Sequence, residues 1–221
     1  MRLDDYNEIK DELVLCLQME ENIKEGVFSI PVKGTDMAAT FRISLAETQG
    51  HMIGALIGEG AVKGYGVPLK TIFTDAVNAG EKRRPPVLRS MESVLDERIL
   101  GIKPSEGEED DLGDALVYAT VKGDVYGAAV MFYPGFLKKA EERLGGGFYI
   151  IPSSSHELLF LRERDCESLW ETRELIRMVN TNEVEVQDRL SDELFYSKEG
   201  KLYLVNTDND GRLEEISLEL P

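Results

Sequence analysis

Hydrophobic and polar residues follow the most regular pattern in the second half of the chain. Short apolar runs bounded by turn residues have the length and composition of strands, and longer runs with apolar residues three or four apart are typical of helices. The pattern predicts strands at residues 116–121, 127–132, 148–151 and 158–161, helices at 136–144 and 165–180, and a three-stranded meander over 190–218. We expect Trp170 to face the core from the helix at 165–180.

The first half has a less regular pattern, interrupted by glycine and proline. The apolar spacing from Tyr6 to Leu17 predicts a first helix that ends near Asn22. Glycine at five positions between 54 and 66 favours a loop, and its spacing matches neither a dinucleotide fingerprint nor a phosphate-binding loop. The other predicted elements are strands at 27–32 and 39–45, a helix at 68–80, an exposed basic connector at 81–86 and a helix at 88–101.

Residues 103–113 separate the two halves. They carry Glu106, Glu108, Glu109, Asp110 and Asp111 and show no apolar periodicity, which is typical of an exposed acidic linker. We therefore predict an N-terminal α+β region at 1–102 and a C-terminal α+β domain at 114–221. The fold class is α+β, with a largely antiparallel sheet, helices on one face of it, a C-terminal β-meander, and a smaller N-terminal α+β part.

Several runs in the second half also resemble a known family. The runs at 133–135, 148–154, 156–157, 179–180 and 190–192 are similar to a bacterial family of uncharacterised proteins, a domain of unknown function. The resemblance covers the C-terminal half only. Because the family has no assigned activity, the resemblance implies no chemistry for these residues.

The chain is acidic throughout its length. The net charge is −17, of which residues 1–112 contribute −8 (21 acids, 13 bases) and residues 113–221 contribute −9 (21 acids, 12 bases). Such a surface repels nucleic acids and anionic membranes, so we expect neither as a direct partner. It could meet a basic protein, imitate a nucleic acid towards a nucleic-acid-binding protein, or serve only solubility. The two cysteines, the acidic N-terminus and the absence of a long apolar run predict a cytoplasmic protein.

Candidate chemistry is sparse. Three serines precede His156 and Glu157, so Ser154, His156 and Glu157 are weak candidates for a hydrolase-like site, although these serines could instead satisfy backbone groups in a turn. The five acidic residues of 106–111 are weak candidates for a binding surface. With two histidines and two distant cysteines, we expect no metal site and no cofactor. We therefore favour a non-enzymatic, protein-binding role, with the hydrolase as the alternative and a small-molecule pocket beneath residues 54–66 as a third possibility.

Overall fold

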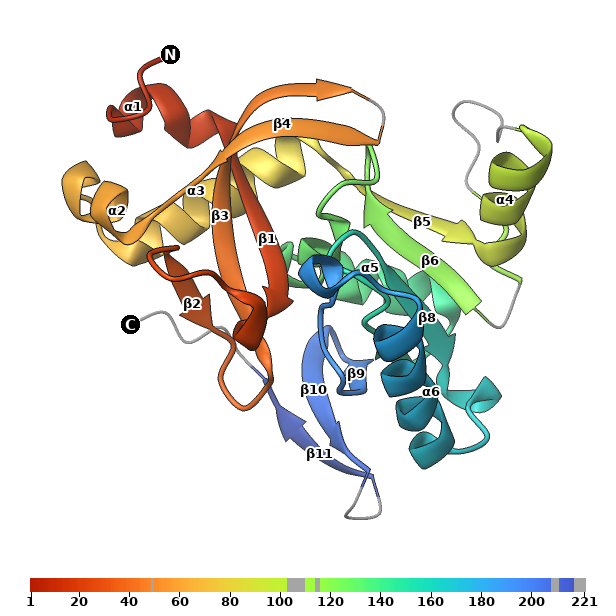
Figure 1. Ribbon diagram of the computed structural model, residues 1–221. Helices are drawn as coiled ribbons and strands as arrows, with labels where there is room; N and C mark the ends of the chain where they lie inside the picture. Colours follow the sequence, from red (N-terminus) through yellow and green to blue (C-terminus); the bar gives the residue numbers. More distant parts are fainter. Residues whose placement is uncertain (49, 103–109, 114–115, 208–210, 217–221) are drawn as a thin grey trace.

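A computed structural model describes residues 1–48, 50–102, 110–113, 116–207 and 211–216, and it contains two antiparallel sheets (Figure 1). The described part of the first sheet has four strands in which β3 pairs with each of the others. These strands are β1 (Leu13–Met19), β2 (Ser29–Pro31), β3 (Met37–Thr48) and β4 (His51–Leu56).

The second sheet has seven described strands in the order β11-β10-β9-β7-β8-β6-β5. Its three C-terminal strands form the predicted meander, and the α+β fold class is confirmed. The strands are β5 (Pro86–Ser90), β6 (Leu116–Val121), β7 (Phe148–Ile151), β8 (Leu158–Arg162), β9 (Phe195–Lys198), β10 (Lys201–Asn206) and β11 (Arg212–Glu215). Because β5 precedes the acidic segment and pairs with β6, the predicted division at 103–113 runs through this sheet.

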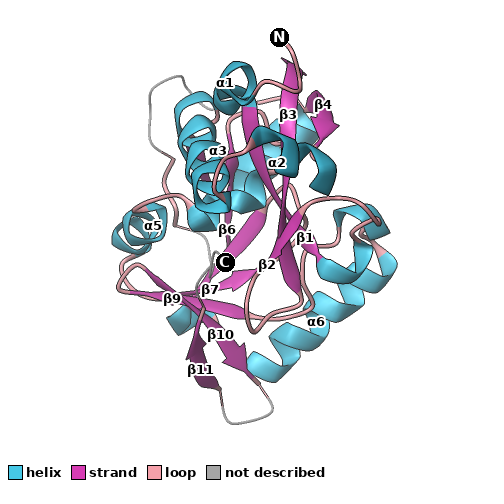
Figure 2. Cartoon of the chain, turned by 90° about the vertical axis from the view of Figure 1, so that its left-hand side faces the viewer, coloured by secondary structure: helices cyan, strands magenta, loops and turns pink. Residues whose placement is uncertain are grey.

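The helices cover both sheets, as Figure 2 shows from a second direction. Phe136 of α5 packs against Phe160, whereas Ile176 of α6 packs with Tyr196, so these helices lie on opposite faces of the second sheet, and the expectation of helices on one face is wrong. The described α-helices are α1 (Tyr6–Ile9), α2 (Glu59–Tyr65), α3 (Leu69–Arg83), α4 (Met91–Leu95), α5 (Phe136–Leu144) and α6 (Leu169–Asn182). Short 3₁₀ or π turns are η1 (Lys10–Glu12), η2 (Glu20–Asn22), η3 (Asp96–Leu100), η4 (Gly127–Phe132), η5 (Glu163–Asp165) and η6 (Val186–Asp188).

Four predictions of secondary structure are wrong. The predicted first helix is a short α1 followed by strand β1, and the predicted loop at 54–66 contains the end of β4 and all of α2. The strand expected at 127–132 is η4, and residues 88–90, expected to begin a helix, belong to β5. In β1 five consecutive residues are buried, so its apolar residues serve both faces and imitate helical spacing.

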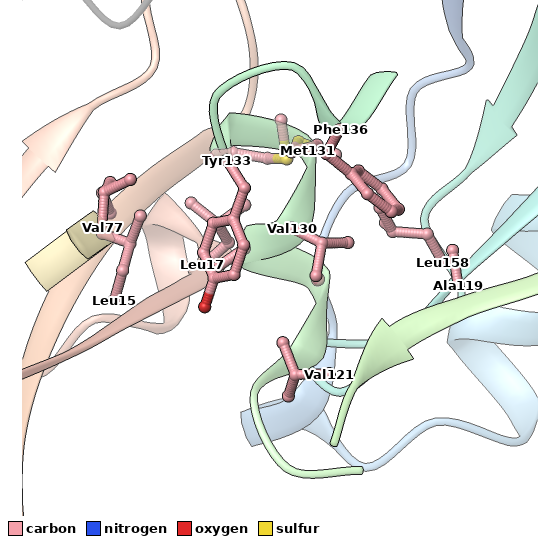
Figure 3. Packing of buried hydrophobic residues seen from close by; sticks show 14 of the residues in the cluster. Leu15, Leu17, Val77, Ala119, Val121, Val130, Met131, Tyr133, Phe136 and Leu158 are labelled. Carbon is pink, nitrogen blue, oxygen red and sulfur yellow. The ribbon is translucent and has the colours of Figure 1, made fainter. Parts of the chain in front are cut away.

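One hydrophobic core joins the two sheets. Figure 3 shows Leu15 and Leu17 of β1 facing Val130 and Tyr133, with Leu158 of β8 beyond them. A second, smaller cluster fills the space between α6 and the other face of the second sheet. Trp170 is 59% exposed on α6, so the prediction that it lies in the core is wrong.

Candidate functional site

The imidazole of His156 is held on both of its ring nitrogens. His156 lies in the loop between β7 and β8, where its Nδ1 accepts a hydrogen bond from the Tyr126 backbone N–H at 3.0 Å. Its Nε2 lies 3.3 Å from Oδ1 of Asp188 in η6. Because Nδ1 accepts this hydrogen bond, a neutral ring would carry its proton on Nε2, the nitrogen beside the Asp188 carboxylate. Nδ1 is thus occupied by a backbone N–H, and Nε2 lies beside a carboxylate.

Two of the three serines beside His156 form side-chain hydrogen bonds inside their own turn. Ser154 Oγ accepts a hydrogen bond from the His156 backbone N–H at 3.0 Å, and Ser153 Oγ donates to Glu157 Oε1 at 3.2 Å. Ser155 is buried, and its Oγ has no hydrogen-bond partner among the described residues. The structure therefore brings Ser154, His156 and Glu157 into one turn without joining a serine hydroxyl to the imidazole, an arrangement that gives the hydrolase hypothesis no support.

A series of side-chain contacts connects this turn to the first sheet. The guanidinium of Arg42 on β3 lies 5.0 Å from the ring centre of Tyr126, and the Tyr126 ring lies 5.2 Å from that of His156. Tyr126 has a left-handed backbone, with φ at 53°. Burial raises the pKa of its hydroxyl above the ordinary value. These contacts were not predictable from sequence patterns, because the residues come from segments far apart along the chain.

An acidic cleft lies where the two sheets meet. It has a volume of about 500 Å³ and is lined by Met19, Glu20, Glu21, Asp36 and Asp192. Backbone hydrogen bonds join the segments that line the cleft. The Met19 N–H donates to the Arg189 carbonyl at 3.1 Å, and the Glu20 N–H donates to the Asp36 carbonyl at 2.7 Å. The cleft therefore depends on the docking of β1 and of the turn before β3 against residues 189–192.

Two of the four carboxylates in the cleft have fixed orientations. Asp36 accepts hydrogen bonds from the Ser191 hydroxyl and, at 2.8 Å, from the Asp192 N–H. Asp192 Oδ1 accepts one from Nδ2 of Asn180 at 2.7 Å. Glu20 and Glu21 are exposed on η2. Among the residues that the structure describes, no cation lines the cleft and none of its four carboxylates forms an ion pair.

The acidic residues proposed from the sequence lie elsewhere. Glu106, Glu108 and Glu109 fall outside the described residues. Asp110 Oδ2 accepts from the Ser90 N–H at 3.0 Å, and Asp111 is exposed. The cleft residues were missed because their charges come from three separate segments. Only the pair Glu20-Glu21 was visible as a local concentration of charge.

The structure also places the groups considered for a metal. Within the described ranges, no group of three or more His, Cys, Asp or Glu side chains is arranged to hold a metal ion. Cys16 and Cys166 are both free thiols, and burial raises the pKa of Cys16 to about 12. Cys16 therefore carries no charge near neutral pH. In the described part of the chain, every helix is too short or too polar to cross a bilayer.

Comparison with known proteins identifies the family but no activity. Residues 1–198 match the model of a family of unknown function, DUF5688, and the chain belongs to that family. The match covers nearly the whole chain, which corrects the expectation that the resemblance stops at the C-terminal half. No curated protein and no solved structure matches the chain.

Proposed function

We propose that this chain binds a cationic segment of another protein at the acidic cleft. The observation that carries the proposal is the convergence of four carboxylates in the cleft, none of which is paired with a cation of the described residues. Like charges gathered at one place repel each other, and a bound lysine or arginine relieves that repulsion. The role is non-enzymatic, because the binding needs no bond to be made or broken.

The shape and composition of the cleft favour a basic side chain over a free inorganic cation. Met19 offers an apolar surface to the methylene stem of a lysine or arginine, and the carboxylates receive the charged end. The fixed carboxylates of Asp36 and Asp192 are already oriented, so binding costs little of their conformational entropy. Glu20 and Glu21, which are free to move, can adapt to a second charge along the partner.

The overall charge supports the same proposal at longer range. A net charge of −17 speeds the approach of a basic partner and opposes nucleic acids and anionic membranes. The alternative of imitating a nucleic acid requires a row of charges spaced like phosphates. The cleft concentrates its charge at one point instead, so a short basic segment is the better match.

A peptide-binding experiment tests the proposal. A fluorescein-labelled octa-arginine peptide is titrated with the protein, and anisotropy is measured at low and at physiological salt. The double variant Glu20→Gln/Glu21→Gln removes two exposed cleft charges that make no side-chain hydrogen bond in the described part of the chain. At ~0.5–1 kcal/mol for each exposed charge pair, affinity should fall roughly 5- to 30-fold.

The matched control removes the same charge from other places. Glu142→Gln/Glu214→Gln changes two exposed carboxylates on α5 and β11 that do not line the cleft. This variant should bind within about twofold of the unaltered protein. Equal weakening by both double variants would show that attraction is spread over the surface, and the cleft would lose its assigned role.

A further inference from the structure

Arg84 is a buried cation with an unusual shortage of partners. It follows α3, is 3% exposed, and its Nε has no hydrogen-bond partner among the residues that the structure describes. Its one ion pair within the described residues joins Nε to Glu47 Oε2 at 3.6 Å, which is too long for a hydrogen bond. A guanidinium has five N–H donors, and a buried one is normally satisfied by carboxylates or carbonyls. Arg84 thus retains capacity for an anionic ligand.

A second guanidinium, that of Arg42, lies on the same face of β3 as Ser44, whose hydroxyl binds the Glu47 carboxylate beside Arg84. Arg42 stacks over Tyr126 and forms no ion pair with a described carboxylate. It shares this face with Thr40, whose buried Oγ1 has no hydrogen-bond partner in the described part of the chain. Cys16 lies directly across from Thr40 in the β1–β3 register. The charges of Arg42 and Arg84 both reach the thiol of Cys16, where they oppose the rise in its pKa caused by burial.

Few carboxylates of the described residues lie within ion-pair distance of these guanidinium groups. Glu47 is the carboxylate near Arg84, and it also lies 3.9 Å from Arg83 while accepting a hydrogen bond from Ser44 Oγ at 2.7 Å. Arg83 has a further partner in Glu12, but Arg42 and Arg84 do not share it. The neighbouring Tyr133 hydroxyl adds no negative charge near neutral pH, and burial raises its pKa further, to about 12. Within ion-pair distance, the described residues give Arg84 one shared carboxylate and Arg42 none.

We propose that Arg42 and Arg84 form a binding site for an oxyanion, the carboxylate or phosphate group of a small molecule. A planar guanidinium fork matches the paired oxygens of either group, and charge-assisted hydrogen bonds of this kind are strong in a partly buried place. Thr40 Oγ1 supplies a further hydroxyl on the same face. The site is distinct from the acidic cleft in its residues and in the sign of its charge.

Ligand titration of the full chain tests the site. Inorganic phosphate and citrate are titrated separately at constant ionic strength, with chloride as the balancing salt, and thermal unfolding and calorimetric binding are recorded. Phosphate and citrate distinguish a phosphate from a carboxylate ligand. A ligand that binds the folded protein gives a saturable heat of binding and a Tm that keeps rising as its concentration exceeds Kd, so at least one of the two should show both effects while chloride shows neither.

Variants assign any binding to the two arginines. Arg84→Met and Arg42→Met should each weaken the binding by roughly 10- to 100-fold, the usual effect of losing hydrogen bonds to a charged group. Arg83→Met is the matched control, because the Arg83 side chain is more exposed than that of Arg84 and has Glu12 as a further carboxylate partner. This variant should bind the anion within about threefold of the unaltered protein. Absence of saturable binding of both anions to the unaltered protein overturns the proposal even where a variant fails to fold. Equal loss in all three variants overturns it as well.

Discussion

Gly127 provides a sharp test of how the His156 turn is held. It begins η4, and a Cβ built on it would lie 2.9 Å from the Val121 backbone nitrogen and closer still to the His156 carbonyl oxygen and Thr120 Oγ1. Two of these neighbours are backbone atoms of packed strands or turns, which cannot move away as the end of a flexible side chain can. We therefore predict that Gly127→Ala strongly destabilises the fold.

The magnitude follows from the contacts that must change. Overpacking of this kind costs about 1–3 kcal/mol. Relief of the clash moves the His156 carbonyl, which accepts hydrogen bonds from the Gly127 N–H at 2.9 Å and from Thr120 Oγ1 at 2.8 Å. Weakening these two bonds adds about 1–2 kcal/mol. The sum is about 2–5 kcal/mol, which corresponds to a fall in Tm of roughly 5–15 °C for a domain of this size.

Urea unfolding followed by circular dichroism measures the change in the free energy of unfolding. Gly64→Ala is the matched control, because Gly64 is exposed within α2 and its added Cβ would meet no atom within 4 Å. That control should stabilise the protein by about 0.5–1 kcal/mol through helix propensity. A Gly127→Ala variant within 1 kcal/mol of the unaltered protein would refute the claim that the turn is tightly packed.

Two further predictions concern the core. Phe160→Ala should cost about 3–5 kcal/mol in urea unfolding, because Phe160 is fully buried with Phe148 at a ring distance of 4.5 Å; a cost below 2 kcal/mol would contradict this packing. Burial raises the pKa of Tyr133 to about 12, so between pH 10 and 12 the unfolded chain loses this proton and the folded protein keeps it. Stability should therefore fall over that range by about 2–3 kcal/mol more than in Tyr133→Phe, and parallel pH profiles of the two proteins would oppose this assignment.

The regular elements of the second half were predictable because each has one dominant signal. Alternating burial in β8 and glycine after α5 are local features that a sequence displays directly. β1 was wrongly predicted as part of a helix because it is buried on both faces, which removes the alternation that distinguishes a strand. η4 was wrongly predicted as a strand because its small apolar residues pack between the sheets in a compact turn, and a run of the same composition could also form a strand.

The candidate sites were less predictable than the fold because they combine distant segments. Asp36 and Asp192 are 156 positions apart and meet where the Asp192 backbone N–H donates to the Asp36 carboxylate. Arg84 belonged to a basic run predicted to be an exposed connector, yet its side chain is buried beside Glu47. A sequence reports the charge of each residue, whereas burial and convergence depend on how the two sheets pack.

The two proposed sites should act independently at physiological salt. Asp36 directly precedes β3 and Arg42 lies six residues further on, which places their Cα atoms about 20 Å apart along an extended strand. That separation exceeds the Debye length of about 8 Å at 0.15 M ionic strength, so the charges at one site are screened from a ligand at the other.

Arg42→Met should therefore change the affinity for the octa-arginine peptide by less than about twofold at physiological salt. At about 0.01 M salt the screening length grows to about 30 Å, and the variant should then bind the peptide more tightly than the unaltered protein, because a repelling charge has been removed. An equally large effect at both salt concentrations would mean that the sites are coupled through the packing of the strands and not through charge.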